Sequence, residues 1–200
     1  MFEFLSRGGL LVIPILLCSV VALAIFLERL IRIAWLRRRG RGLAHQVADL
    51  IKQGNDDQAH DLAIASESPM GAVLEQALEV KDKSQETLEG IIMHATEEQL
   101  RGISRYLQAL ATIGNIAPLL GLLGTVVGMI KAFMVIQEMG GKVNAAVLAG
   151  GIWEAMLTTA MGLCVALPVI IAHSYLVSEV NRYEARLQRG AITFLKAVVK

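Results

Sequence analysis

Three long stretches of the sequence are almost free of charged residues. Residues 8–27 and 106–130 carry no charge over 20 and 25 positions, and residues 143–178 carry one, Glu154, over 36. A helix rises about 1.5 Å per residue, so about 20 apolar residues cross the hydrocarbon core of a bilayer. Because backbone polar groups inside lipid have to bond one another, helices are the expected form. The pattern predicts an all-α membrane protein with three transmembrane helices.

The first apolar stretch differs in composition from the other two. It is dominated by Leu, Ile and Val, whereas the second and third are also rich in Gly, Ala and Thr. Small side chains let helix backbones approach one another closely in membranes. We therefore expect the first helix to be peripheral and the other two to form an inner layer.

The polar segments also show helical patterns. Residues 43–51 and 73–78 each place apolar side chains on one helical face, and Ser84 is a candidate N-cap. No helix-breaking residue lies between Ser84 and the second apolar stretch, so the pattern predicts one continuous helix from Ser84 through the membrane. Residues 179–200 are expected to continue the third span as a helix.

Lys and Arg are distributed unevenly along the chain. Of 19 in total, 11 lie in residues 29–105 and five in residues 179–200. Basic residues accumulate on the cytoplasmic side of membrane proteins, so the N-terminus is expected in the periplasm and the C-terminus in the cytoplasm of a bacterium, with the chain in the inner membrane. The cluster of Arg37, Arg38 and Arg39 is interpreted as a topology anchor at the lipid headgroups. A formal net charge of +1 provides no basic field for nucleic acid.

These boundaries predict six segments. They are an N-terminal periplasmic end with the first transmembrane helix (1–28), a cytoplasmic helical domain (29–105), the second transmembrane helix (106–137), a short periplasmic loop (138–150), the third transmembrane helix (151–178) and a cytoplasmic C-terminal helix (179–200).

The second and third spans each carry one face of small and weakly polar residues. That of the second span comprises Gly114, Pro118, Gly121, Thr125, Gly128 and Ala132, and that of the third comprises Gly151, Ala155, Thr158, Gly162 and Ala166, with Thr159 beside it. Spacings of three and four residues place each set on one side of a helix. Two interpretations fit, namely tight helix packing alone or packing together with a lined pore. Because Thr often bonds its own backbone, its hydroxyl does not decide between them.

Glu154 is the single acidic residue of the third apolar stretch, near its outer end. Carboxylates inside membranes are rare and usually face the protein interior or water. A carboxylate near a helix N-terminus at the interface is also favoured by the helix dipole. Glu154 is therefore either an interfacial residue or a proton-accessible group near a pore mouth.

The sequence lacks the motifs of the common catalytic sites, so we do not expect an enzyme. The sequence has no Walker lysine motif, HExxH pair, CxxC pair or nucleophile elbow. We expect no catalytic residue, no cofactor and no metal. No Asp lies within any apolar stretch, so a titratable carboxylate in the middle of the membrane would have to come from another chain.

Two segments resemble the signature of the MotA/TolQ/ExbB proton channel family. They are residues 117–130, APLLGLLGTVVGMI, and residues 149–168, AGGIWEAMLTTAMGLCVALP. With three spans rather than four, the chain is more similar to ExbB and TolQ than to MotA. The resemblance implies a homopentamer around a central pore lined by the second and third spans. A dimer of a single-span ExbD- or TolR-like partner would sit inside and carry the membrane Asp.

The resemblance also implies a function and site residues. The proton gradient would drive motion that is passed to TonB or TolA. By position, Thr125 and Thr159 match the pore threonines, Glu154 matches the polar residue of the third helix, and Pro118 matches a helix-deforming position.

Two residues depart from the family pattern. Asn115 places an amide where a small residue is expected, and Lys131 places a positive charge near the outer end of the second span. Lys131 is available to pair with Glu138 or with acidic residues of a partner.

Three hypotheses for the function follow. The first is an ExbB-like motor subunit that energises outer-membrane transport, and the second is a TolQ-like motor subunit for envelope integrity and cell division. The third is a structural membrane scaffold without ion flux, in which the Gly and Thr faces serve packing only.

Overall fold

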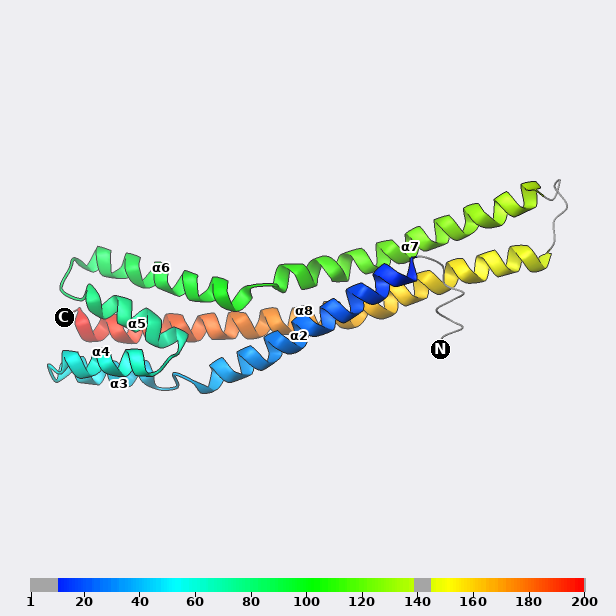
Figure 1. The fold of residues 1–200 in the computed structure, drawn as a ribbon. Coiled ribbons are helices and arrows are strands. Elements are labelled where there is room, and N and C mark those ends of the chain that lie inside the picture. The colour runs from blue at the N-terminus through cyan, green and yellow to red at the C-terminus, as the bar shows by residue number, and fades with distance from the viewer. Residues whose placement is uncertain (1–10, 139–144, 200) are drawn as a thin grey trace. The chain divides into compact units, whose positions relative to one another are not determined.

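The computed structural model describes residues 11–138 and 145–199, and every regular element there is a helix (Figure 1). The helices are α2 (Val12–Arg38), α3 (Leu43–Lys52), α4 (Asp56–Ala65), α5 (Pro69–Glu79), α6 (Gln85–Ser104), α7 (Leu107–Glu138) and α8 (Ala145–Val198). Helices α2, α7 and α8 each contain a stretch with a mean hydropathy of 2.2, long and apolar enough to cross a membrane. An all-α chain with three such helices is therefore confirmed. The predicted N-terminal end at residues 1–10 and residues 139–144 of the predicted loop lie outside the described residues.

The chain divides into two compact units. The apolar unit comprises the described residues up to Leu27 and those of Tyr106–Ser174, and the polar unit comprises Glu28–Arg105 and the described residues of Tyr175–Lys200. Helices α2 and α8 contribute to both units, and α8 is unbroken over 54 residues. The expectation that the third span continues as a helix is confirmed as far as Val198, and Lys200 lies outside the described residues.

Serine caps stabilise the starts of two helices of the polar unit, α5 and α6. The Ser68 hydroxyl accepts a hydrogen bond of 3.1 Å from the Gly71 amide, and Pro69 occupies the first turn of α5. The Ser84 hydroxyl accepts one of 3.3 Å from the Thr87 amide at the start of α6, as predicted. Such caps satisfy amides that have no partner inside the helix, and each typically contributes about 1 kcal/mol.

The core of the polar unit joins the short helices to the C-terminal part of α8. Fully buried apolar side chains come from α3, α5, α6 and α8, namely Val47, Val73, Leu74, Leu88, Leu187 and Phe194. Burial of each such side chain contributes about 1.5–3 kcal/mol. Gly190 of α8 lies directly against the side chains of Met70 and Ala44, so α8 approaches both α5 and α3 closely.

Arg29 of α2 closes the C-terminus of α6. Its side chain is 1% exposed, and Nη1 donates to the carbonyl oxygens of Gly102 and Ile103, both at 3.3 Å. The last carbonyls of a helix have no intrahelical partner and carry partial negative charge. A buried guanidinium both bonds these oxygens and compensates that charge, while Glu28 pairs with it at 2.6 Å.

Helices α6 and α7 are separate, so the predicted continuous helix from Ser84 through the membrane is wrong. Arg105 has φ −51° and ψ 138°, and Tyr106 has φ +68°. In a continuous helix Tyr106 and Leu107 would donate to the carbonyls of Gly102 and Ile103, which Arg29 bonds instead. Neither residue at the break is a helix breaker by type, so the local sequence carries no signal for it.

The left-handed backbone at Tyr106 generates a prediction. A β-branched residue is strained at positive φ, whereas Asn tolerates it. We expect Tyr106→Val to be less stable than Tyr106→Asn by about 1 kcal/mol or more, read from thermal unfolding of the detergent-purified protein. Both variants lose the aromatic ring, so the difference between their stabilities reports the cost of a β-branched residue at positive φ. Equal stabilities would show that the break does not depend on φ at this position.

Tyr183 is a buried phenol of the polar unit. It is 4% exposed, and burial raises its pKa from 10.0 to about 12, against a smaller lowering by the charge of Arg186. Since the folded pKa lies above the unfolded one, the folded state resists ionisation. This contribution to stability is fully present below pH 10 and is lost as the pH rises from 10 to about 12.

We therefore expect the wild type to lose stability between pH 10 and 12 relative to Tyr183→Phe, because the variant has no phenol to ionise there. Helix content followed by circular dichroism against pH measures this difference. The Tyr106→Phe control retains Tyr183 and should follow the wild type. The same loss in Tyr183→Phe would assign the effect to another group.

Candidate functional site

Helices α7 and α8 run alongside each other (Figure 1). The glycines at which they touch leave no room for a side chain. A Cβ at Gly121 would lie 2.9 Å from the Thr158 carbonyl oxygen and 2.9 Å from the Thr159 Cα. A Cβ at Gly162 would lie 2.6 Å from the Ala117 carbonyl oxygen. Backbone atoms of a packed helix cannot yield as a flexible side chain does, so the two helices approach backbone to backbone.

The same contact extends along both helices. A Cβ at Gly128 would lie 3.0 Å from that of Ala155, and one at Gly151 would lie 2.7 Å from that of Ala132. At the other end, a Cβ at Gly114 would lie 3.0 Å from Cγ1 of Ile170. Members of the small-residue faces identified in the sequence thus meet each other within one chain. We term this contact the glycine seam, and its glycines are Gly114, Gly121, Gly124 and Gly128 of α7 and Gly151 and Gly162 of α8. Its α7 members, including Ala117 and Gly124, are buried, while Pro118 is half-buried.

The three threonines on or beside the small-residue faces differ in what their hydroxyls bond. Thr159 donates to the Gly121 carbonyl oxygen of α7 at 2.9 Å. Thr158 is 2% exposed and donates to Ala155 of its own helix at 2.7 Å. Thr125 is half-buried and donates to Leu122 at 2.6 Å. Of the three, Thr159 links the two helices, and each hydroxyl retains lone pairs that can accept a hydrogen bond.

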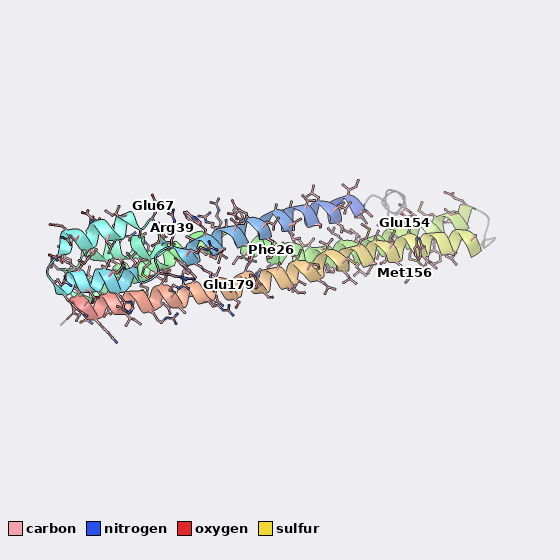
Figure 2. All side chains as sticks on the ribbon, turned by 90° about the horizontal axis from the view of Figure 1, so that it is seen from below. Phe26, Arg39, Glu67, Glu154, Met156 and Glu179 are labelled. Atoms are coloured by element: carbon pink, nitrogen blue, oxygen red, sulfur yellow. The ribbon has the colours of Figure 1, made fainter. Side chains whose placement is uncertain are left out.

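Glu154 forms an ion pair across the same two helices. Figure 2 labels Glu154 on α8. Its carboxylate lies 3.6 Å from Nζ of Lys131, and the side chains of Glu154 and Lys131 are 32% and 58% exposed. The sequence suggested Glu138 or a partner's acid for Lys131, whereas the structure provides Glu154. In water such an exposed pair contributes up to about 1 kcal/mol, and in surroundings of lower dielectric constant the attraction strengthens. Glu154 and Thr159 therefore both reach α7 from one helix.

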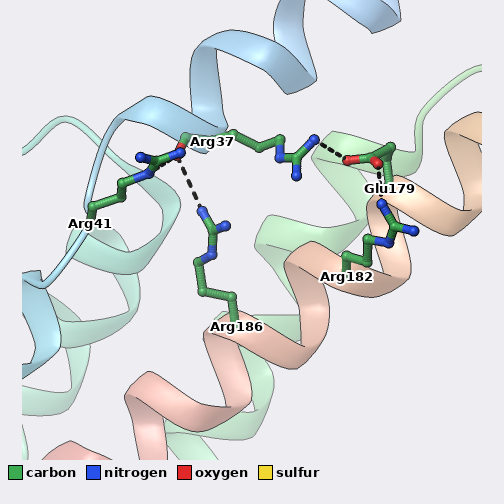
Figure 3. Close-up of polar contacts among 5 residues, drawn as sticks. All are labelled: Arg37, Arg41, Glu179, Arg182 and Arg186. Atoms are coloured by element: carbon green, nitrogen blue, oxygen red, sulfur yellow. Dashed lines mark hydrogen bonds and ion pairs between the residues drawn. The ribbon is translucent and has the colours of Figure 1, made fainter.

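The arginine cluster at the end of α2 contacts the protein itself. Arg37 pairs with Glu179 at 2.7 Å, and Glu179, which is 4% exposed, also pairs with Arg182 at 2.9 Å (Figure 3). Arg39 pairs with Glu67 at 2.6 Å, and Figure 2 labels both residues. The Arg39 guanidinium also stacks 3.7 Å above the ring of Trp35.

Headgroup anchoring by this cluster stays a prediction, and Arg38 is its exposed member. No motif or periodic pattern in the sequence marks Arg29 or Glu179 as important. The available signal was position, because Arg29 lies next to the first charge after the first apolar stretch and Glu179 is the first charge after the third.

Comparison with known proteins decides the family. Residues 65–189 match the MotA/TolQ/ExbB proton channel family. The chain belongs to this family. It is thus a channel-family protein and not an enzyme, and the predicted resemblance is confirmed.

Individual members of the family match over most of their length. The biopolymer transport protein exbB1 of Vibrio cholerae is 33% identical over 186 residues, which cover 90% of this chain and 80% of that protein. ExbB of Salmonella typhimurium is 33% identical over 88% of this chain and 75% of that protein. The putative ExbB-like protein 1 of Synechocystis is 34% identical over 88% of this chain and 70% of that protein.

The family match covers the glycine seam and part of the polar unit. It extends from the end of α4 to Arg189 in α8 and so includes Thr159, Glu154 and Glu179. In the described part of this MotA/TolQ/ExbB chain, no group of three or more His, Cys, Asp or Glu could hold a metal ion.

The glycine seam generates a stability prediction. Gly162→Ala places a methyl group against the Ala117 carbonyl, so we expect a loss of about 1–3 kcal/mol from overpacking. Gly150→Ala makes the same change on the same helix where nothing lies within 4 Å, and it should be neutral or nearly so. Thermal unfolding in detergent compares them. A Gly162→Ala variant as stable as Gly150→Ala would contradict the close approach of the two backbones.

Proposed function

We propose that this chain is the channel subunit of an ExbB-type motor in the bacterial inner membrane, driven by the proton motive force. With an ExbD-like single-span partner, it would energise TonB-dependent transport across the outer membrane. Family membership and the relatives named as biopolymer transport proteins support this role. The observation that carries it is the Thr159 hydroxyl bonded across the seam, on the same helix as Glu154.

The proposed assembly is a homopentamer with α7 and α8 around a central pore and α2 outside. Large apolar side chains away from the seam leave α7 and α8 with surfaces to be covered by lipid or by other copies. Examples more than half exposed are Leu119, Leu122, Phe133, Met156, Leu167 and Ile171. In this proposal residues 1–28 hold the N-terminal periplasmic end and the first transmembrane helix, and residues 106–137 and 151–178 are the second and third transmembrane helices. The uneven distribution of Lys and Arg supports a cytoplasmic location for residues 29–105 and 179–200.

The proposed proton path uses the partner's Asp and this chain's polar groups. Because the Thr159 hydroxyl donates its hydrogen bond to the Gly121 carbonyl oxygen, the hydroxyl oxygen is left as an acceptor. An acceptor bonds a protonated carboxyl and not a carboxylate, so this site favours the neutral form of a passing Asp. Thr125 offers the same chemistry on α7, and Glu154 provides a polar group near the pore mouth. The burial of Thr158 supports a packing role for that residue within the seam.

The energy available suits such a cycle. One proton crossing 100 mV releases about 2.3 kcal/mol. This is comparable to the interactions that would be exchanged at each step, since a single hydrogen bond contributes about 0.5–1.5 kcal/mol. Close glycine packing within each chain would keep α7 and α8 together as one body while the partner moves past them.

Thr159→Val is the decisive variant, because it keeps the shape of the side chain and removes the hydroxyl. We expect assembly with the partner to persist and proton flux to fall by up to about tenfold. The protein is co-expressed with its Asp-bearing partner, weighed by native mass spectrometry, and assayed for proton flux in liposomes. Thr159→Ser should restore flux, and Thr158→Val should leave it unchanged.

Two results would overturn the assignment of this chain to a proton-driven motor. One is an oligomer that never retains the single-span partner. The other is proton flux in Thr159→Val equal to that of the wild type, which would favour a structural scaffold in which Gly and Thr serve packing alone.

A further inference from the structure

An open cavity in the polar unit is bordered by basic side chains and by no acidic ones. Its volume is about 590 Å³, and it lies among the turn at residues 40–42, the first turn of α3, Met70 of α5 and the C-terminal part of α8. Arg41, His45, Arg186 and Arg189 supply its charged and polar wall, while Met70 and Ile192 supply an apolar one. A concave site with few polar groups on an apolar wall is the usual form of a small-molecule site.

The three arginines of this cavity have no carboxylate partner among the described residues. Arg41 donates through Nε and Arg186 through Nη1 to one acceptor, the Arg37 carbonyl oxygen, at 3.1 and 3.2 Å (Figure 3). Arg189 takes part in none of the ion pairs that the described chain forms. The carboxylate of Glu179 is occupied by Arg37 and Arg182.

Two like charges are therefore held close together with little compensation. The Arg37 carbonyl lies at the C-terminus of α2, where the helix dipole supplies roughly half a negative charge. The cavity still has an excess of positive charge. A guanidinium carries five N–H donors, of which Arg41 and Arg186 each use one on this carbonyl. Their free edges and the unpaired Arg189 are suited to the paired oxygens of a phosphate.

We propose that this cavity binds a phosphate-bearing anion, carried by a small soluble molecule or by the headgroup of an anionic lipid. The volume exceeds that of a bare phosphate and lies in the range of about 300–1,000 Å³ found for ligand pockets. Arg186 and Arg41 form the fixed part of the site because the α2 carbonyl orients them. Arg189 and His45, both exposed, close on the ligand from the open side. The site shares no residue with the proposed proton path, so either proposal can fail without the other.

Inorganic pyrophosphate is the probe, titrated calorimetrically into the purified full-length protein. We expect saturable binding by the wild type and a loss of affinity of roughly tenfold in Arg189→Gln, because one charge-assisted contact disappears. Lys196→Gln removes the same charge from an exposed position of the same helix outside the cavity and should bind as the wild type does. Absence of saturable binding, or equal weakening in both variants, would overturn the site.

Reconstitution distinguishes the two sources of the anion. The titration is repeated in nanodiscs of phosphatidylcholine alone and of phosphatidylcholine with phosphatidylglycerol. A weaker apparent affinity for pyrophosphate in the nanodiscs with phosphatidylglycerol shows that the lipid competes with pyrophosphate. If Arg189→Gln abolishes this competition, the site is assigned to a lipid headgroup. Equal affinity in the two nanodiscs assigns it to a soluble phosphorylated molecule.

Discussion

The contact between the backbones of α7 and α8 is the constraint on which the apolar unit depends. In lipid, the hydrophobic effect does not drive two apolar helices together, so their association depends on close packing and on hydrogen bonds between them. Gly121 and Gly162 supply the closeness, since neither has space for even a methyl group. That closeness also brings the Gly121 carbonyl within 2.9 Å of the Thr159 hydroxyl. Packing and polar chemistry at this site therefore have one cause.

The polar unit is organised by arginines at helix ends. Arg29 bonds the Gly102 and Ile103 carbonyls near the end of α6, and Arg186 and Arg41 both bond the Arg37 carbonyl near the end of α2. Each guanidinium compensates the partial negative charge at a helix C-terminus where the helix's own hydrogen bonding ends. In α6 the cap coincides with the break before α7. At α2 the same arrangement leaves positive charge beside an open cavity, so the proposed anion site rests on the fold rather than on a sequence motif.

Part of the candidate site could be predicted from the sequence. The periodicity of Gly, Ala and Thr identifies the two faces in part, because spacings of three and four residues place side chains on one side of any helix. On α7 it selects the half-buried Pro118 and Thr125 and misses the buried Ala117 and Gly124. It cannot say whether those faces meet each other or a pore, since both arrangements favour small residues. Thr158 and Thr159 show what the spacing of small residues cannot predict. They are neighbours of the same type, yet one bonds its own helix and the other bonds α7.

The sequence by itself determined the helical class, the three apolar spans and the family, because hydrophobic length, helical period and a local motif are all properties of the linear chain. The tertiary structure alone decided where α6 ends, which acid pairs with Lys131, and that three arginines converge on one cavity. Each of these depends on residues far apart in the chain, such as Arg29 with Gly102 or Arg37 with Arg186. Such contacts leave no periodic signal, because a hydrogen bond between distant segments requires only that the fold bring its two partners within about 3 Å.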